Sequence, residues 1–475
     1  MSASLIRLAP VADELAARFA AAGHSLYLVG GSVRDALLGR HSHDLDFTTD
    51  ARPQQILAAL AGWADAIWDT GIAFGTVGAR KGEHICEVTT FRADSYDRVT
   101  RNPQVTFGDS IEADLLRRDF TVNAMAVELA SGTFVDPYGG MAALHEQRLD
   151  TPATPQESFA DDPLRMLRAA RFASQLGFEP APRVVAAMSG MAEQIDRITA
   201  ERIQAELSKL LLGAYPRRGL ELLVDTGLAE RDRVLPEVPA MRLEIDEHHQ
   251  HKDVYQHSLV VLEQAIELEQ AETPGKPDLV LRLAALLHDI GKPRTRRFEE
   301  GGGVSFHHHE VVGAKMVRKR LRELRYAKDI TEDVAKLVYL HLRFHGYGKG
   351  EWTDSAVRRY VTDAGPLLSR LHKLVRADCT TRNRRKAQAL RDTYTDLENR
   401  IAILAEQENL AKVRPDLDGN EIMRLLNLPP GPLVGKAWRY LKELRLDRGP
   451  MDADEAEAAL RAWALEQGLT PPAAD

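Results

Sequence analysis

Strand-forming patterns are concentrated in the first 150 residues of this 475-residue chain and almost vanish after that point. The early segments are rich in β-branched residues, whereas the later ones show the apolar spacing of helices. The sequence therefore predicts an α+β N-terminal domain followed by mainly α-helical domains. We expect strands at 26–29, 45–48, 76–79 and 85–91, and helices at 11–22, 33–38, 162–176, 199–212 and 216–226.

The length corresponds to about three domains of roughly 150 residues each. Residues 151–155, Thr-Pro-Ala-Thr-Pro, indicate a linker after the α+β part, and Pro236 and Pro239 indicate a loop that ends the next block. Most of the 16 histidines follow that loop. We expect a head at 1–150, a helical neck at 151–245, a histidine-rich helical domain at 246–390 and a helical tail at 391–475.

The composition excludes several classes of protein. The chain carries 62 Lys and Arg against 70 Asp and Glu, a formal net charge of −8, so a nucleic-acid partner requires clustered basic residues. Two cysteines, Cys86 and Cys379, cannot form a disulfide framework or a four-thiolate zinc site. No apolar run approaches the ~20 residues that span a bilayer, and Asp13 and Glu14 argue against a signal peptide. We expect a cytoplasmic protein without a membrane partner.

A glycine pair, Gly30 and Gly31, separates a predicted strand from a predicted helix. Backbone N–H groups at such a junction can hold a phosphate group. A glycine pair alone more often marks a plain turn.

Asp44 and Asp46 follow about a dozen residues later on a predicted strand. Residues two apart on a strand point to the same face, and adjacent carboxylates repel each other unless a cation lies between them. Mg²⁺ is the cation that carboxylates and substrate phosphates together prefer. We therefore favour a metal site over a solvated turn. Glu87, within another strand, is equally consistent with a third ligand and with a solvent-facing side chain.

Five ordered segments resemble the class II template-independent nucleotidyltransferases of the DNA polymerase β superfamily. This family contains the CCA-adding tRNA nucleotidyltransferases and the bacterial poly(A) polymerases. The first segment combines Gly-Gly-Ser-Val-Arg-Asp at 30–35 with Asp-Leu-Asp at 44–46. The others are Arg-Arg-Asp-Phe-Thr-Val-Asn-Ala at 117–124, Asp-Pro-Tyr-Gly-Gly at 136–140, 161–172 and 201–211.

The resemblance implies a role for each matched residue. Asp44 and Asp46 would bind catalytic Mg²⁺, and Asp162 and Arg165 would select the nucleobase. Other matched residues would bind the nucleotide, namely Gly30, Gly31, Arg34, Arg118, Arg168 and Arg171. The RNA hydroxyl would attack the α-phosphorus of CTP or ATP and release pyrophosphate. The residues alone also fit a salt bridge between Arg118 and Asp119 and an ion pair between Asp162 and Arg165 on a solvated helix.

Two features favour CCA addition to tRNA over poly(A) synthesis. Gly75-Thr76-Val77 is similar to a strand of CCA-adding enzymes, and the basic signature that follows the first motif in bacterial poly(A) polymerases is not evident. Residues 92–107, with Tyr96, Arg101 and Pro103, resemble the flexible segment with which CCA-adding enzymes switch from CTP to ATP, and this resemblance argues against a CC-only enzyme. The alternatives are a bacterial poly(A) polymerase and an enzyme that adds only CC or only A.

The histidine-rich block resembles the HD metal-dependent phosphohydrolases, beginning with His-Asp-Ile-Gly-Lys-Pro at 288–293. The resemblance implies a site for Mn, Ni, Co, Fe or Zn, with phosphatase or cyclic phosphodiesterase activity. Lys292 would meet a phosphate. His307 and His308 are less securely assigned, and His248, His249 and His251 are also consistent with a polar helix start. The implied ligands are His257, His288, Asp289, His309, His341 and Asp378.

Basic residues gather in two places where RNA phosphates can bind. One group is Lys315, Lys319 and Arg322 on a predicted helix face, and the second is Arg382, Arg384, Arg385 and Lys386. A solvated surface is the alternative for both groups.

Residues 429–435 resemble the C-terminal tail of CCA-adding relatives.

Overall fold

The computed structural model describes residues 10–40, 43–92, 107–108, 110–242, 253–300, 303–349, 352–380, 384–408 and 414–470. The chain forms two compact units, Met1–Pro239 and Ala240–Asp475. Each unit is described by itself. The domain boundaries expected near residues 150 and 390 stay predictions.

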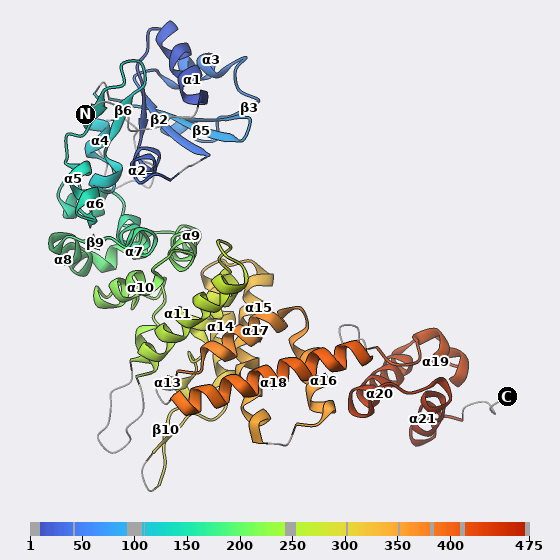
Figure 1. The fold of residues 1–475 in the computed structure, drawn as a ribbon. Helices are drawn as coiled ribbons and strands as arrows, with labels where there is room; N and C mark the ends of the chain where they lie inside the picture. The colour runs from blue at the N-terminus through green and yellow to red at the C-terminus, as the bar shows by residue number, and fades with distance from the viewer. Residues whose placement is uncertain are drawn as a thin grey trace. The chain divides into compact units, whose positions relative to one another are not determined.

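The first unit contains a mixed sheet, in which the described strands follow the order β3-β4-β5-β2-β1-β6-β7 (Figure 1). Neighbours are antiparallel except β2 and β5, which are parallel. The predicted α+β class is therefore confirmed. Three strands were not predicted, because β3, β6 and β7 have only two or three residues each. The strands are β1 (Leu26–Val29), β2 (Asp44–Thr49), β3 (Ala66–Trp68), β4 (Thr76–Lys81), β5 (His84–Thr90), β6 (Ala126–Glu128) and β7 (Phe134–Val135).

One face of this sheet is buried under α1 (Pro10–Ala21) and α3 (Pro53–Leu60). Leu45 and Phe47 of β2 lie in that core. Because side chains alternate along a strand, Asp44 and Asp46 occupy the opposite face. The apolar pattern of β2 thus determines where its carboxylates point. The short helices α2 (Gly31–Leu37), α4 (Ile111–Leu116) and α5 (Gly140–His145) complete the α+β part.

The helical part of the first unit begins at α6 (Pro155–Asp161). The predicted linker instead supplies its start: Thr154 accepts a hydrogen bond from the Glu157 backbone N–H, and Glu157 accepts one from Thr154 N–H. This is a capping box, with Pro155 in the first turn, where its missing N–H costs little. The following elements are α7 (Leu164–Leu176), α8 (Pro182–Met191), α9 (Ala200–Leu211) and α10 (Pro216–Asp225), with a short ladder between β8 (Arg148–Leu149) and β9 (Glu179–Pro180).

Within the described residues of the second unit, the regular structure is helical apart from the hairpin of β10 (Arg297–Phe298) and β11 (Val304–Ser305). A separate apolar core holds the last three helices together. Among the described residues, no helix combines the length and apolar character needed to cross a membrane. The helices are α11 (Val254–Glu272), α12 (Leu279–Leu287), α13 (Lys292–Thr295), α14 (His309–Glu323), α15 (Lys328–Leu340), α16 (Asp354–Ala364), α17 (Leu368–Ala377), α18 (Arg384–Glu408), α19 (Gly419–Leu426), α20 (Pro432–Arg448) and α21 (Ala453–Glu466).

Candidate active site and candidate metal centre

The turn from β1 into α2 brings the backbone close to charged side chains. Gly30 has φ +68°, and a Cβ atom there would lie 2.8 Å from Arg118 Nη1 and 3.8 Å from Asp46 Oδ2. Only glycine combines this backbone conformation with so close an approach. Gly31 is the first residue of α2. The predicted contact of Gly30 and Gly31 with a phosphate stays a prediction.

Three carboxylates share the exposed face of the sheet. Asp46 lies directly beside Glu87 in the register of β2 and β5, and Asp44 lies beside Ile85. Burial raises the pKa of Asp46 despite the nearby Arg118, and Asp44 raises it too. Partial burial, Asp46 and Asp44 raise the pKa of Glu87. Oxygen ligands whose negative charges oppose one another suit a divalent cation such as Mg²⁺.

A cavity of about 310 Å³ opens beside Asp46 and Glu87, and Asp44 is not among the residues that line it. It brings Asp46 and Glu87 together with Asp162, Arg165 and Arg168, which are more than 70 residues away along the chain. The other lining residues are Val29, Phe47, Thr89, Arg92, Asp114, Arg117, Arg118 and Asp119.

The residues expected to select the nucleobase are held by hydrogen bonds to other elements. Asp162 ends α6 in an extended conformation, and its carboxylate accepts a hydrogen bond of 2.7 Å from Arg202 of α9. Arg165 donates to Ser158 Oγ at 2.9 Å and to the Arg117 carbonyl at 2.5 Å. An ion pair between Asp162 and Arg165 on a solvated helix is not what the structure contains. Both side chains are oriented by neighbours outside α7.

The salt bridge between Arg118 and Asp119 is also replaced by other pairs. Arg118 Nη2 lies 3.3 Å from Asp114 Oδ2. Asp119 is buried and accepts hydrogen bonds from Arg168 Nε at 2.7 Å and from the Asn123 amide at 3.0 Å. Burial raises the pKa of Asp119, but Arg168 and Asn123 outweigh burial and hold that pKa well below its usual range. Asp119 therefore fixes Arg168 at the cavity.

Two predicted nucleotide-binding arginines have other partners. Arg34 is buried and donates to Asn123 Oδ1 at 2.7 Å and to both carboxylate oxygens of Asp35. Arg171 is buried against Glu206 of α9, with 3.2 Å between Nε and Oε2, and it does not line the cavity. Burial lowers the pKa of Arg171 to about 10, and the charge of Arg168 contributes to that shift. Their roles in nucleotide binding stay predictions.

The sequence reasoning missed Asp114 at this site. Its carboxylate is 1% exposed, pairs with Arg118 and Arg117, and accepts a long hydrogen bond from the Arg92 backbone N–H. The signal was present, because an acid three and four residues before two arginines on a helix predicts such pairs.

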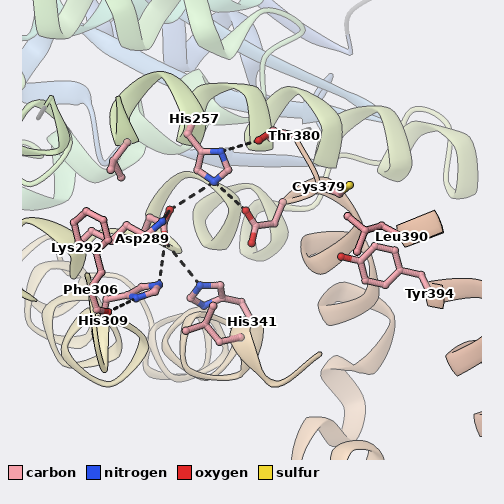
Figure 2. A pocket seen from close by; sticks show the side chains of 13 residues that line it. His257, Asp289, Lys292, Phe306, His309, His341, Cys379, Thr380, Leu390 and Tyr394 are labelled. Carbon is pink, nitrogen blue, oxygen red and sulfur yellow. Dashed lines mark hydrogen bonds and ion pairs between the residues drawn. The ribbon is translucent and has the colours of Figure 1, made fainter. Parts of the chain in front are cut away.

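The histidines and aspartates predicted to bind the HD metal lie at the ends of five helices, some at the first turn and some after the last. His257 lies in α11, His288 follows α12, His309 begins α14, His341 follows α15 and Asp378 follows α17. Figure 2 shows the rings of His257, His309 and His341 directed toward Asp289. The structure therefore brings together all six predicted ligands.

Asp289 lies between two groups of histidines. Its Oδ2 is 3.2 Å from His288 Nε2 and 3.6 Å from His257 Nε2. Its Oδ1 is 3.2 Å from His309 Nε2 and 3.9 Å from His341 Nε2. On the first side, Asp378 Oδ1 lies 2.9 Å from His257 Nε2. Asp289 therefore offers one carboxylate oxygen to each of the two groups of histidines, and both groups could hold a metal ion.

Backbone carbonyls orient three of these rings. The Nδ1 atoms of His288, His309 and His341 lie 2.9, 2.8 and 2.6 Å from the carbonyls of Ala285, Phe306 and Val338. An Nδ1–H bonded in this way leaves Nε2 as the ligand atom. The buried Nε2 atoms of His309 and His341 have no hydrogen-bond partner among the described residues. Burial lowers the pKa of His341 to about 3, and His288 also lowers it. These residues fit a transition metal.

A cavity of about 490 Å³ adjoins the histidines (Figure 2). Apart from the ligands, Lys292 and Thr380, its wall is largely apolar, with Phe306, Leu342 and Tyr394. Lys292 Nζ lies 2.6 Å from Asp289 Oδ2.

Two of the less securely assigned histidines do not join the cluster. His307 and His308 are exposed, whereas His309 is buried within it. His248, His249 and His251 lie outside the described residues.

The predicted RNA contacts are only partly described. Lys319 Nζ lies 3.8 Å from Glu323, and Arg322 lies 3.0 Å from Glu332, so acidic neighbours partly neutralise this basic face of α14. Arg382 and the side chains of Arg384 and Lys386 lie outside the described residues, as do Tyr96, Arg101 and Pro103 of the flexible segment. These RNA contacts stay predictions.

Three family models match the chain in the predicted order. The poly(A) polymerase head domain matches residues 26–150. A probable RNA- and SrmB-binding site of polymerase A matches 177–241. The HD domain matches 254–402.

Individual proteins are similar over different lengths. The chain is 46% identical to a CCA-adding enzyme of Levilactobacillus brevis over 208 residues, which is 44% of this chain but only about half, 51%, of that enzyme. It is 34% identical to an A-adding tRNA nucleotidyltransferase of Deinococcus radiodurans over 448 residues, 92% of this chain and 95% of the relative.

A solved structure is similar over nearly its whole length. It is the Bacillus stearothermophilus CCA-adding enzyme in complex with CTP, with a TM-score of 0.67 and 25% identity over 97% of this chain and 99% of that one. Together with the nearly full-length relative, this similarity establishes that the chain belongs to the class II tRNA nucleotidyltransferase family, with a nucleotidyltransferase head, an RNA-binding region and an HD domain.

Proposed function

We propose that this protein adds CCA to the 3′ end of tRNA, using CTP and ATP and releasing pyrophosphate. The observation that carries the proposal is the cavity in which Asp46 and Glu87 face Asp162, Arg165 and Arg168. Carboxylates suited to metal-assisted phosphoryl transfer and side chains able to bind a nucleobase edge therefore line the same cavity. A protein-made base-recognition surface removes the need for a nucleic-acid template.

The chain's own residues position the reactants. Asp44, Asp46 and Glu87 supply the oxygen ligands for Mg²⁺, which when bound would balance the charge of the phosphates. Arg118 lies beside Gly30 and Asp46, and a guanidinium there can donate to two phosphate oxygens at once. Arg168 adds positive charge to the same cavity, held in place by Asp119. Catalysis then rests on orientation and electrostatics.

A second candidate is addition of the terminal A alone. The similarity to an A-adding enzyme over 92% of this chain favours it. The similarity to the CCA-adding enzyme solved with CTP favours the wider activity. Poly(A) synthesis and CC-only addition use the same type of head domain, and the products of one incorporation assay distinguish all four activities.

The test uses purified protein, Mg²⁺ and labelled CTP or ATP with three RNAs. These are a tRNA lacking CCA, a tRNA ending in CC, and an unstructured oligoadenylate. We expect two CTP additions followed by one ATP addition on the first RNA. ATP addition only to the tRNA ending in CC would identify an A-adding enzyme, CTP addition without ATP addition would identify a CC-adding enzyme, and long tails on oligoadenylate would identify a poly(A) polymerase. Any of these three results would overturn CCA addition.

We propose further that the HD domain hydrolyses phosphoesters with a transition metal. The unsatisfied Nε2 atoms of His309 and His341 and the central position of Asp289 support this proposal. The test is hydrolysis of bis(p-nitrophenyl) phosphate with Mn²⁺ or Ni²⁺. No metal binding and no hydrolysis would contradict it.

A further inference from the structure

A third group of metal-ligating side chains lies in the head, outside both sites described above. His43 immediately precedes β2, and Glu83 and His84 lie where β4 turns into β5. The Ile85 backbone N–H donates to the His43 carbonyl at 2.9 Å, so the pairing of β2 with β5 extends to His43. Two segments that are 40 residues apart in sequence are thereby brought together at one end of the sheet.

The three side chains converge on a small volume. One ligand atom from each lies within 4.8 Å of the other two. His43 Nδ1 is 3.9 Å from Glu83 Oε2, and the two imidazole centroids are 5.6 Å apart. A tetrahedral metal ion brings its ligand atoms to separations in this range after small side-chain rotations.

One atom of this group needs a partner. His84 Nδ1 is buried and has no hydrogen-bond partner among the described residues. A buried polar atom without a partner destabilises the folded state, and a bound metal ion would remove that penalty. By contrast, the side chains of His43 and Glu83 are 64% and 75% exposed, so an ion can enter from solvent.

We propose that His43, Glu83 and His84 bind a transition-metal ion, with Zn²⁺ as the best match to two imidazoles and one carboxylate. Three protein ligands are the number that leaves a fourth position for water. Mg²⁺ is a poor match, because it prefers oxygen ligands. The site is distinct from the HD cluster in the second unit.

Metal binding here would act on the strand that carries the catalytic carboxylates. The ion would link the residue before Asp44 to the turn before β5, the strand that carries Glu87. It would therefore stabilise the register of β2 against β5. Because Leu45 points to the core, His43 and Asp44 project toward different faces, and the ion would not occupy the cavity itself.

The test measures Zn²⁺ bound to the full-length protein by competition with a chromophoric chelator. His43→Ala and His84→Ala are compared with the unmodified protein and with His145→Ala, an exposed histidine of the same head. All four proteins retain the HD and carboxylate sites, so differences in the amount of bound Zn²⁺ report on the group of His43, Glu83 and His84. We expect each of the first two variants to lose one equivalent of Zn²⁺ and the control to lose none.

Thermal unfolding provides the second measurement. Zn²⁺ should raise the Tm of the unmodified protein more than that of His43→Ala, because ligand binding to the folded state stabilises it. If His84→Ala does not fold, His43→Ala still decides the question, since its side chain is largely exposed. Equal Zn²⁺ stoichiometry and equal Tm shifts in His43→Ala and the unmodified protein would overturn the proposal.

Discussion

The role of Glu87 depends on the residue that lies beside it in the folded sheet. In the sequence it is one acidic residue in an apolar strand, and both a metal-ligand role and a solvent-facing role fit it. In the structure it lies beside Asp46 across the one parallel strand pair of the described sheet. This position favours a third ligand.

Glu87→Gln should lower the kcat of nucleotide incorporation by roughly 10²-fold, because a catalytic electrostatic contact of this kind has that effect. Higher Mg²⁺ should restore part of the rate. The measurement is single-turnover incorporation of labelled CTP at several Mg²⁺ concentrations. Glu128→Gln, on β6 of the same sheet, serves as the control. Full activity of Glu87→Gln at low Mg²⁺ would exclude a ligand role.

The ion pair of Asp119 with Arg168 should make the free energy of unfolding depend on pH. The folded-state pKa of Asp119 lies below its unfolded value, so its stabilisation is complete above about pH 5 and is lost as pH falls through 4 and below. Asp119→Asn should cost about 2–3 kcal/mol at pH 7, less than a fully buried pair because Arg168 is one-third exposed. Urea unfolding of both proteins at pH 7 and pH 3.5 measures this. The difference between them should shrink at the lower pH, and a constant difference would contradict the assignment.

At the scale of elements, the predicted HD ligands come from the ends of five helices. No two of these helices place a complete ligand set by themselves. Helix ends suit this purpose because the chain turns there and side chains can converge from several directions. The apolar faces of α11, α12, α15 and α17 pack together and hold the ends in place.

Removal of the metal should therefore loosen this helical domain. A ligand at a hundredfold excess over its Kd contributes about 2.7 kcal/mol, which corresponds to about 5–10 °C in Tm for a unit of this size. We expect dialysis against a chelator to lower Tm by that amount and Mn²⁺ to restore it. Asp46→Asn is the control, because its transferase metal site is already impaired. A Tm insensitive to chelation would show that no metal is bound there.

At the scale of the whole molecule, the two candidate sites belong to different compact units. Each has its own core and its own cavity. Mutations at sites that share no partners usually have additive effects. We therefore expect a substitution at one site to abolish the activity of that site and to leave the other activity unchanged.

Asp289→Asn should abolish phosphoester hydrolysis while CTP incorporation stays within about twofold of normal. Asp46→Asn should have the reverse effect. Both reactions are measured on both full-length variants, with circular dichroism to verify folding. If either variant loses both activities while remaining folded, the two sites are coupled.

The sequence by itself determined the α+β class and the order of the parts, because strand and helix periodicities are local patterns. Ordered motifs that resemble known families also named many of the residues that line the two cavities. It did not reveal the short strands β3, β6 and β7, which are too brief to show a period. It did not reveal that the predicted linker at 151–155 ends in the capping box that begins α6.

Only the tertiary structure decided which charges meet. Asp119 pairs with Arg168 of α7, 49 residues further along the chain, and no local pattern predicts that contact. Glu87 joins Asp46 through a strand register that no single segment encodes. Electrostatic and metal-ligand interactions act over a few ångströms in space, and the packing of the apolar core sets those distances.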